Sequence, residues 1–187
     1  MESNDHFIKF PYRKEVRDNG DINNGGIDLV LEPQRISEIH EINGFTWLKR
    51  FIQTINSENG FFMTFGCVAG REEKIVGYID FSVRPQATSS LRTYVHNLES
   101  LFYSYLHESM SNMGQENPQQ ATDYAKMSLI WEETPLEIYG QTYSKLTVIF
   151  QVVSEDAAEW IFSHLEYFLS EYFPSLPHVK AQRPVQM

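Results

Sequence analysis

The chain has 187 residues, the length of one domain, and 42% of them are hydrophobic, so it can bury a core and global disorder is excluded. It carries 25 acidic and 15 basic residues, a formal net charge of −10, which disfavours nucleic acids and anionic membranes as partners. The single cysteine excludes an internal disulfide and a metal site of several thiolates. The first residues lack a signal-peptide pattern and no apolar run reaches the length of a membrane span, so we expect a cytoplasmic protein.

The N-terminal residues 1–26 predict a flexible lead-in that contributes at most one edge strand. Residues 7–10, Phe-Ile-Lys-Phe, are the segment that could add this strand. Runs of Asp, Asn and Gly at residues 18–21 and 23–26 are typical of turns. We expect one α+β domain over residues 27–177, followed by a disordered tail over residues 178–187.

The first half of this domain predicts one strand, one helix and a β-hairpin. Residues 27–32 alternate apolar and polar side chains and predict a strand, and residues 37–56 follow a helical period. Two further alternating runs, residues 61–69 and 75–83, flank a short polar turn and predict the hairpin. Cys67 falls on the apolar face of its strand, which predicts an inert core thiol.

The second half predicts a helix over residues 89–113, a polar loop over residues 111–122 and two strands around residues 125–131 and 146–152, separated by a turn-rich segment. A final helix begins near Ser154 or Asp156. The resulting order, β-α-β-β-α-β followed by β-α, predicts a two-layer, mainly antiparallel, ferredoxin-like fold extended by a C-terminal strand and helix.

Known motifs of catalysis are missing from the sequence. It contains no phosphate-binding loop, no dinucleotide-binding glycine pattern and no nucleophile elbow. His40-Glu41 and His107-Glu108 start like a zinc-binding helix, but Gly44 and Ser111 stand where the second histidine is needed. We therefore expect no metal and no cofactor.

Asp80 is the one weak candidate for a catalytic or ligand-binding group. It lies in the middle of a predicted strand, where Asp is unfavourable, on the face opposite Ile79 and Phe81. The alternatives are that it pairs with a lysine or arginine, or faces water.

The second sheet face, on which Asp80 lies, carries so much apolar area that it needs a cover. Homodimerisation through this face and coverage by residues 1–26 are both open solutions, as is a partner protein. Its apolar side chains are Phe62, Val68, Val76, Tyr78, Ile130 and Ile149.

The acidic residues gather in residues 127–179, where eight acids face a single base, Lys145. An acidic surface with aromatic anchors is suited to a basic protein partner, whereas a solvated acidic helix is the alternative. The predicted partner-binding residues are Glu132, Glu133, Glu137, Glu155, Asp156, Glu159 and Glu166, with Trp131, Tyr139 and Tyr143.

These features favour a non-catalytic acidic protein-binding module, most simply an inhibitor or an immunity or antitoxin protein that neutralises a basic protein. One alternative is a small-molecule enzyme or ligand carrier of the dimeric ferredoxin-like type, with Asp80 and Tyr78 lining its pocket and His96 or His107 as further candidates. Another alternative is an assembly subunit of a phage or secretion machine.

Overall fold

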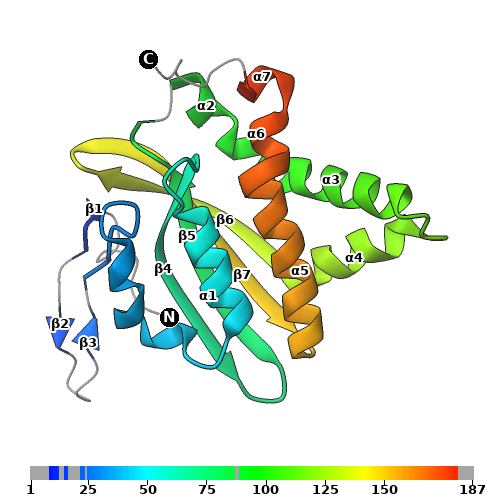
Figure 1. Cartoon of the computed structure of the whole chain (residues 1–187), viewed down its shortest axis with the longest axis horizontal. Helices are drawn as coiled ribbons and strands as arrows, with labels where there is room; N and C mark the ends of the chain where they lie inside the picture. The colour runs from blue at the N-terminus through cyan, green and yellow to red at the C-terminus, as the bar shows by residue number, and fades with distance from the viewer. Residues whose placement is uncertain (1–8, 13–14, 17–21, 24, 87–88, 181–187) are drawn as a thin grey trace.

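The computed structural model describes residues 9–12, 15–16, 22–23, 25–86 and 89–180. Five strands form one open sheet in the order β1-β6-β7-β5-β4, and two short strands form a separate pair (Figure 1). All neighbours in the large sheet are antiparallel except β1 and β6. The strands are β1 (Lys9–Phe10), β2 (Glu15–Val16), β3 (Ile22–Asn23), β4 (Phe62–Arg71), β5 (Ile75–Val83), β6 (Leu129–Ile138) and β7 (Gln141–Val152).

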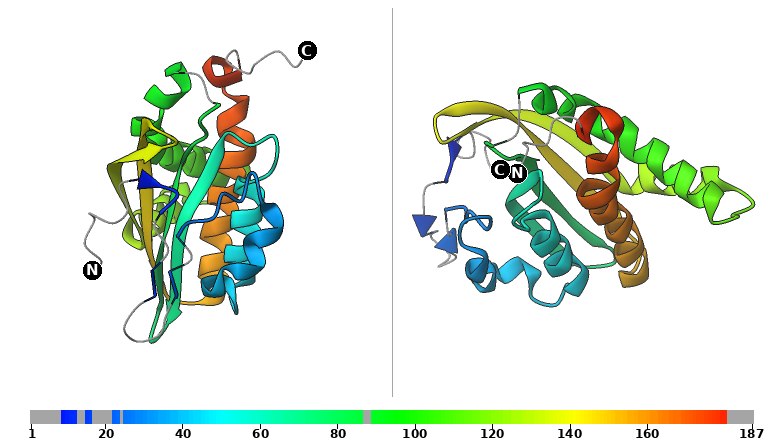
Figure 2. Two further views of the ribbon diagram at one scale, coloured as in Figure 1. Left: turned by 90° about the vertical axis from the view of Figure 1, so that its left-hand side faces the viewer. Right: turned by 45° about the horizontal axis from the view of Figure 1, so that its top comes forward.

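The helices form a layer on one face of this sheet. In the edge-on view of Figure 2, α1 and α5 lie together on one side of the strands. The helical elements are η2 (Pro33–Glu38), η3 (His40–Ile42), α1 (Thr46–Ile55), α2 (Ser89–Thr93), η4 (Val95–Asn97), α3 (Leu98–Asn112), α4 (Pro118–Ser128), α5 (Glu155–Tyr167), the π-helix η5 (Phe168–Tyr172), α6 (Phe173–Ser175) and α7 (Pro177–Lys180). No described helix is long and apolar enough to cross a membrane.

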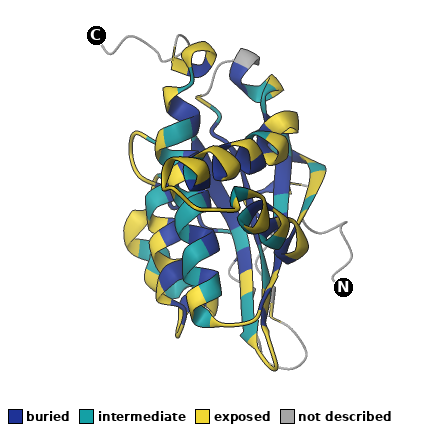
Figure 3. Cartoon of the chain, turned by 90° about the vertical axis from the view of Figure 1, so that its right-hand side faces the viewer, coloured by how far each residue is buried: buried dark blue, intermediate teal, exposed yellow. Residues whose placement is uncertain are grey.

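Aromatic side chains join the helical layer to the sheet. Trp47 of α1 stacks on Phe162 of α5 with ring centroids 4.5 Å apart, and both rings contact Phe150 of β7. Further along the sheet, Phe102 of α3 packs against Trp131 of β6. In Figure 3 the strands behind the helices are mostly buried, while the helices expose their outer sides. The high aromatic content is therefore used in the core, where each ring buries a large apolar area.

The predicted β4–β5 hairpin is confirmed, but a β-bulge changes which side chains share a face. Thr64 lies opposite Phe81 while Gly66 lies opposite Asp80, so two steps along β4 match one step along β5. An extra residue in one strand reverses the alternation beyond it. The prediction that Phe62 lies on the second face is therefore wrong. Phe62 packs on Phe81 and on Phe173 in the helical layer.

The predicted first strand, residues 27–32, is wrong, and the ferredoxin-like order is not confirmed. The Asp28 carboxylate accepts hydrogen bonds from the backbone N–H groups of Val30 and Leu31, which closes a turn. The side chains of Ile27 and Leu29, at this turn, are buried in the core. Their alternation therefore reflects insertion into the core rather than strand pairing. The coarser prediction of an α+β fold with a mainly antiparallel sheet is confirmed.

The boundaries around β6 also differ from the prediction. Helix α4 begins at Pro118, inside the predicted polar loop, and continues to Ser128. Strand β6 then runs through the segment predicted to be rich in turns, including Pro135. Proline lacks an N–H donor, but β6 pairs with β1 at only two positions, so its outer edge tolerates proline. At the start of α5, the Ser154 hydroxyl accepts from the Ala157 N–H, as expected of an N-cap.

Candidate functional site

The second face of the sheet, away from the helical layer, divides into a covered half and an open half. The covered half lies under the described residues of the N-terminal segment. Phe10 pairs with Ile138 at the β6 edge, and its ring packs 5.0 Å from that of Phe65 and 5.6 Å from that of Tyr12. A Cβ atom on Gly26 would lie 2.8 Å from the Phe10 ring, so only glycine allows this approach. The N-terminal segment thus forms a close-packed cover.

Asp80 lies in this covered half and forms a buried ion pair. Its Oδ2 atom is 3.2 Å from Lys145 Nζ, and its Oδ1 atom accepts from the Thr147 hydroxyl at 2.5 Å. The two charged side chains are only 8% and 9% exposed. Burial raises the pKa of Asp80, against the opposing effects of Lys145 and Thr147. Burial also raises the pKa of Tyr12, and the Asp80 charge adds to this effect. This geometry closes the carboxylate off from bulk solvent and gives it a structural partner.

The open half of the second face carries one apolar row that crosses all four long strands. Val68, Tyr78, Ile149 and Ile130 are consecutive cross-strand partners. Ile130 is 60% exposed, Val68 is 41% exposed, and the adjacent Val76 is 39% exposed. Exposed branched aliphatic side chains that line up on one sheet face are typical of a contact surface. We call this set, Val68, Val76, Tyr78, Ile130 and Ile149, the open row.

One acid borders the open row. Glu132 lies two residues from Ile130 on β6, in the cross-strand row that contains Thr147 and Asp80. It is exposed, and no described cation forms an ion pair with it. Lys145 of β7 is already neutralised by Asp80. The β6 end of the open row therefore carries a negative charge, whereas the exposed Lys74 lies two residues from Val76.

The predicted partner-binding acids lie in two separate places. On α5, Glu159 and Glu166 form ion pairs with Arg50 of α1, at 2.6 and 3.1 Å. Glu155 pairs with Arg71 and also accepts from the Trp47 indole N–H at 2.8 Å. These contacts hold α5 against α1 and β4. Asp156 is exposed and forms no ion pair with any described base.

The acids of β6 are also partly neutralised. Glu137 pairs with Lys9 at 2.7 Å, and Glu133 Oε2 lies 2.7 Å from His96 Nδ1. Burial acts to raise the pKa of Glu133, but hydrogen bonds from Ser144 and His96 outweigh it and lower the pKa. Glu132 is thus the β6 acid that faces solvent without a described cationic partner.

The three predicted aromatic anchors have different surroundings. Trp131 points into the helical layer, where Phe81 and Phe102 surround it. Tyr143 is buried, and the Arg92 guanidinium lies 4.2 Å from its ring centroid. Tyr139 is exposed at the β6–β7 turn, and its hydroxyl donates to Asp28 at 2.6 Å. The structure therefore does not bring the ten predicted residues into one surface.

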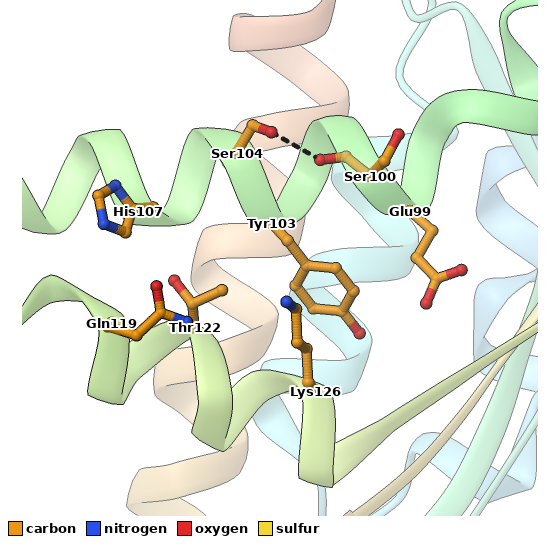
Figure 4. A pocket seen from close by; sticks show the side chains of 8 residues that line it. All are labelled: Glu99, Ser100, Tyr103, Ser104, His107, Gln119, Thr122 and Lys126. Atoms are coloured by element: carbon orange, nitrogen blue, oxygen red, sulfur yellow. Dashed lines mark hydrogen bonds between the residues drawn. The ribbon is translucent and has the colours of Figure 1, made fainter.

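A groove of about 740 Å³ runs between α3 and α4 (Figure 4). It holds one acid and one base, Glu99 and Lys126, and the Lys126 ammonium lies 5.4 Å from the Tyr103 ring centroid. His107 lines this groove, whereas Asp80 and Tyr78 do not, so it is not the pocket predicted for an enzyme or carrier. Its lining residues are Glu99, Ser100, Tyr103, Ser104, His107, Gln119, Thr122 and Lys126.

Metal and thiol chemistry receive no support from the described geometry. The described residues contain no group of three side chains that could hold a metal ion. Cys67 is buried as predicted, and burial raises the pKa of its thiol to about 12. Such a thiol is a poor nucleophile at neutral pH.

Comparison of the chain with known protein families, characterised proteins and solved structures finds no match. The site is therefore defined by its own geometry. The five side chains of the open row were predicted from the sequence to lie on the second face. Which of them stay exposed depends on the cover formed by the N-terminal segment.

Proposed function

We propose that this chain is a non-catalytic protein-binding module that binds a basic protein partner on the open half of its sheet. The open row is the observation that carries this proposal. Three of its aliphatic side chains stay substantially exposed although the same face is covered a few residues away. Full burial of one such side chain contributes about 1.5–3 kcal/mol, so a partner that covers the row gains several such contributions.

The charge of the chain supports a basic partner rather than a second copy. A second copy would bring another net charge of −10 towards this face, and the two copies would repel each other. A positively charged partner would instead be attracted, and Glu132 at the edge of the row would meet one of its cations. An inhibitor or an immunity or antitoxin protein for a basic target is the form of this function that the acidity favours.

Partner capture by open-row variants tests this function. The wild-type chain, tagged at its C-terminus, is used to capture proteins from a lysate of its natural host. Ile130→Asp places a charge at the most exposed position of the row, and Met113→Asp places the same charge on another exposed apolar residue, at the end of α3. We expect the wild type and Met113→Asp to retain one stoichiometric partner with an isoelectric point above 7, and Ile130→Asp to lose it.

Three outcomes would contradict the proposal. The first is that no protein is retained in stoichiometric amount. The second is that the partner also binds Ile130→Asp with unchanged affinity. The third is that size-exclusion chromatography with light scattering shows a dimer of the wild-type chain that Ile130→Asp converts to a monomer, since the open row would then be occupied by a second copy.

A further inference from the structure

The C-terminal helical segment contains a short sequence repeat that coincides with a change of helix type. Glu-Tyr-Phe occurs at residues 166–168 and again at residues 171–173. The spacing of five residues matches the i to i+5 hydrogen bonds of η5. A π-helix therefore places the two tyrosines on one side and the two phenylalanines on another, which a regular α-helix with 3.6 residues per turn would not do.

The two phenylalanines and the two tyrosines of this repeat have separate environments. Phe168 and Phe173 are buried, and their rings contact Phe102 and Phe62 of the core. The tyrosines instead surround Tyr105 of α3. Tyr167 stacks on Tyr105 with an interplanar angle of 27°, and the Tyr172 ring centroid lies 4.8 Å from that of Tyr105. We call Tyr105, Tyr167 and Tyr172 the tyrosine cluster.

Polar contacts hold the tyrosine cluster in place. The Tyr172 hydroxyl donates to Glu108 Oε2 at 3.1 Å. This bond leaves Oε1 of the same carboxylate as a further acceptor. The Tyr105 hydroxyl lies 3.1 Å from His164 Nδ1. Burial lowers the pKa of His164, which favours the neutral imidazole beside the cluster. Tyr167 is 53% exposed, so part of this side chain faces solvent.

The two helical segments that form the cluster contain no lysine or arginine. This holds for residues 98–112 and for residues 155–176. The same segments contribute seven acids. Of these, Glu108 accepts a hydrogen bond from Tyr172, and Glu171 directly precedes Tyr172 in the sequence. Tyr167 is 53% exposed and Glu108 is also exposed, so one tyrosine ring and one carboxylate of this surface face solvent. Both kinds of group attract a cation.

We propose that the tyrosine cluster and Glu108 form a binding site for a guanidinium group, such as the arginine side chain of a peptide. A guanidinium is planar and carries several N–H groups, so it can stack on a tyrosine ring of the cluster and donate to Glu108, which already accepts from Tyr172. An ammonium group can form only the charge contact with the carboxylate and a weaker contact with the ring. This site lies on the helical layer and is independent of the open row.

Nuclear magnetic resonance of the aromatic side chains tests this site with a defined probe. A capped peptide of four arginines is titrated into the full chain carrying ¹³C-labelled tyrosine, and a capped peptide of four lysines serves as a probe of equal charge. We expect the arginine peptide to shift the resonances of Tyr167 and Tyr172 saturably and to bind more tightly than the lysine peptide. Tyr167→Ala should weaken binding of the arginine peptide by about two- to fivefold, the range of an exposed cation–π contact.

Matched variants separate the site from general attraction to an acidic protein. Tyr167→Phe keeps the ring and should retain binding, whereas Glu108→Gln should weaken it. Tyr139→Ala removes a tyrosine of nearly equal exposure, 54% against 53% for Tyr167, from the distant β6–β7 turn. Glu116→Gln removes an exposed acid between α3 and α4. Neither control should change the affinity. Equal shifts with both peptides, or equal affinity of Tyr167→Ala and the wild type, would overturn the proposal.

Discussion

The covered half and the open half of the second sheet face differ in which side chains they carry and in whether these are buried. The covered half contains the charged pair of Asp80 and Lys145, and the N-terminal segment lies over it. The open half contains Val68, Val76 and Ile130, and these side chains face solvent. If burial of apolar area were the only factor, the N-terminal segment would instead lie over the aliphatic side chains of the open half.

This difference identifies which half is structural and which is available for binding. A buried ion pair is costly to form and needs its surroundings to be complete, so the covered half has to be fixed within the chain itself. An exposed aliphatic row costs the isolated chain little and becomes favourable when a partner covers it. Substitutions should therefore affect folding in the covered half and binding in the open half.

The largest loss of stability is expected from Lys145→Ala. The variant leaves the buried Asp80 carboxylate without its cation and should lower the free energy of unfolding by about 3–5 kcal/mol. Urea denaturation followed by circular dichroism measures this change. The double variant Asp80→Asn, Lys145→Met removes both charges and should recover much of the loss. If Lys145→Ala is as stable as the wild type, the ion pair has no structural role.

Phe10→Ala should have the next largest effect, because it removes the ring that joins the N-terminal cover to Phe65 and to the β6 edge. Loss of a buried phenylalanine ring costs about 3 kcal/mol. Hydrogen exchange should show that protection falls first in residues 25–31 and at Ile138, while the helical layer keeps its protection. Equal loss of protection in α1 and α5 would show that the cover is not a separate unit.

Val68→Thr and Ile130→Thr, made together, should have the smallest effect on stability. Threonine keeps the branched shape that favours strands, and neither position is buried, so the free energy of unfolding should change by no more than about 0.5 kcal/mol. The same urea denaturation measures it. A loss of 2 kcal/mol or more would mean that these side chains are buried in solution. Partner capture should nevertheless weaken, which would separate binding from folding.

Several local features could be predicted from the sequence because they depend on neighbouring residues. The β4–β5 hairpin followed from two alternating runs, and the burial of Cys67 followed from its position between apolar neighbours. The N-cap of α5 at Ser154 followed from short-range hydrogen bonding. The position of Asp80 on the second face was also predicted, together with the alternative that it pairs with a lysine.

Other features could not be predicted because they depend on contacts between distant segments. The alternation at residues 27–32 is compatible with a strand, but the Asp28 side chain closes a turn and the buried side chains enter the core from there. The acids of α5 looked like a free surface until the fold brought Arg50 and Arg71 beside them. The tyrosine cluster was missed, although the repeated Glu-Tyr-Phe at a spacing of five was a signal that could have found it.

The sequence by itself determined the acidity, the α+β composition and the presence of a second apolar face. These properties follow from residue counts and from alternation along single segments. The tertiary structure decided that the N-terminal segment covers the Asp80 half of this face and leaves the open row exposed. That choice depends on long-range packing of Phe10, Phe65 and Gly26, which no local pattern encodes.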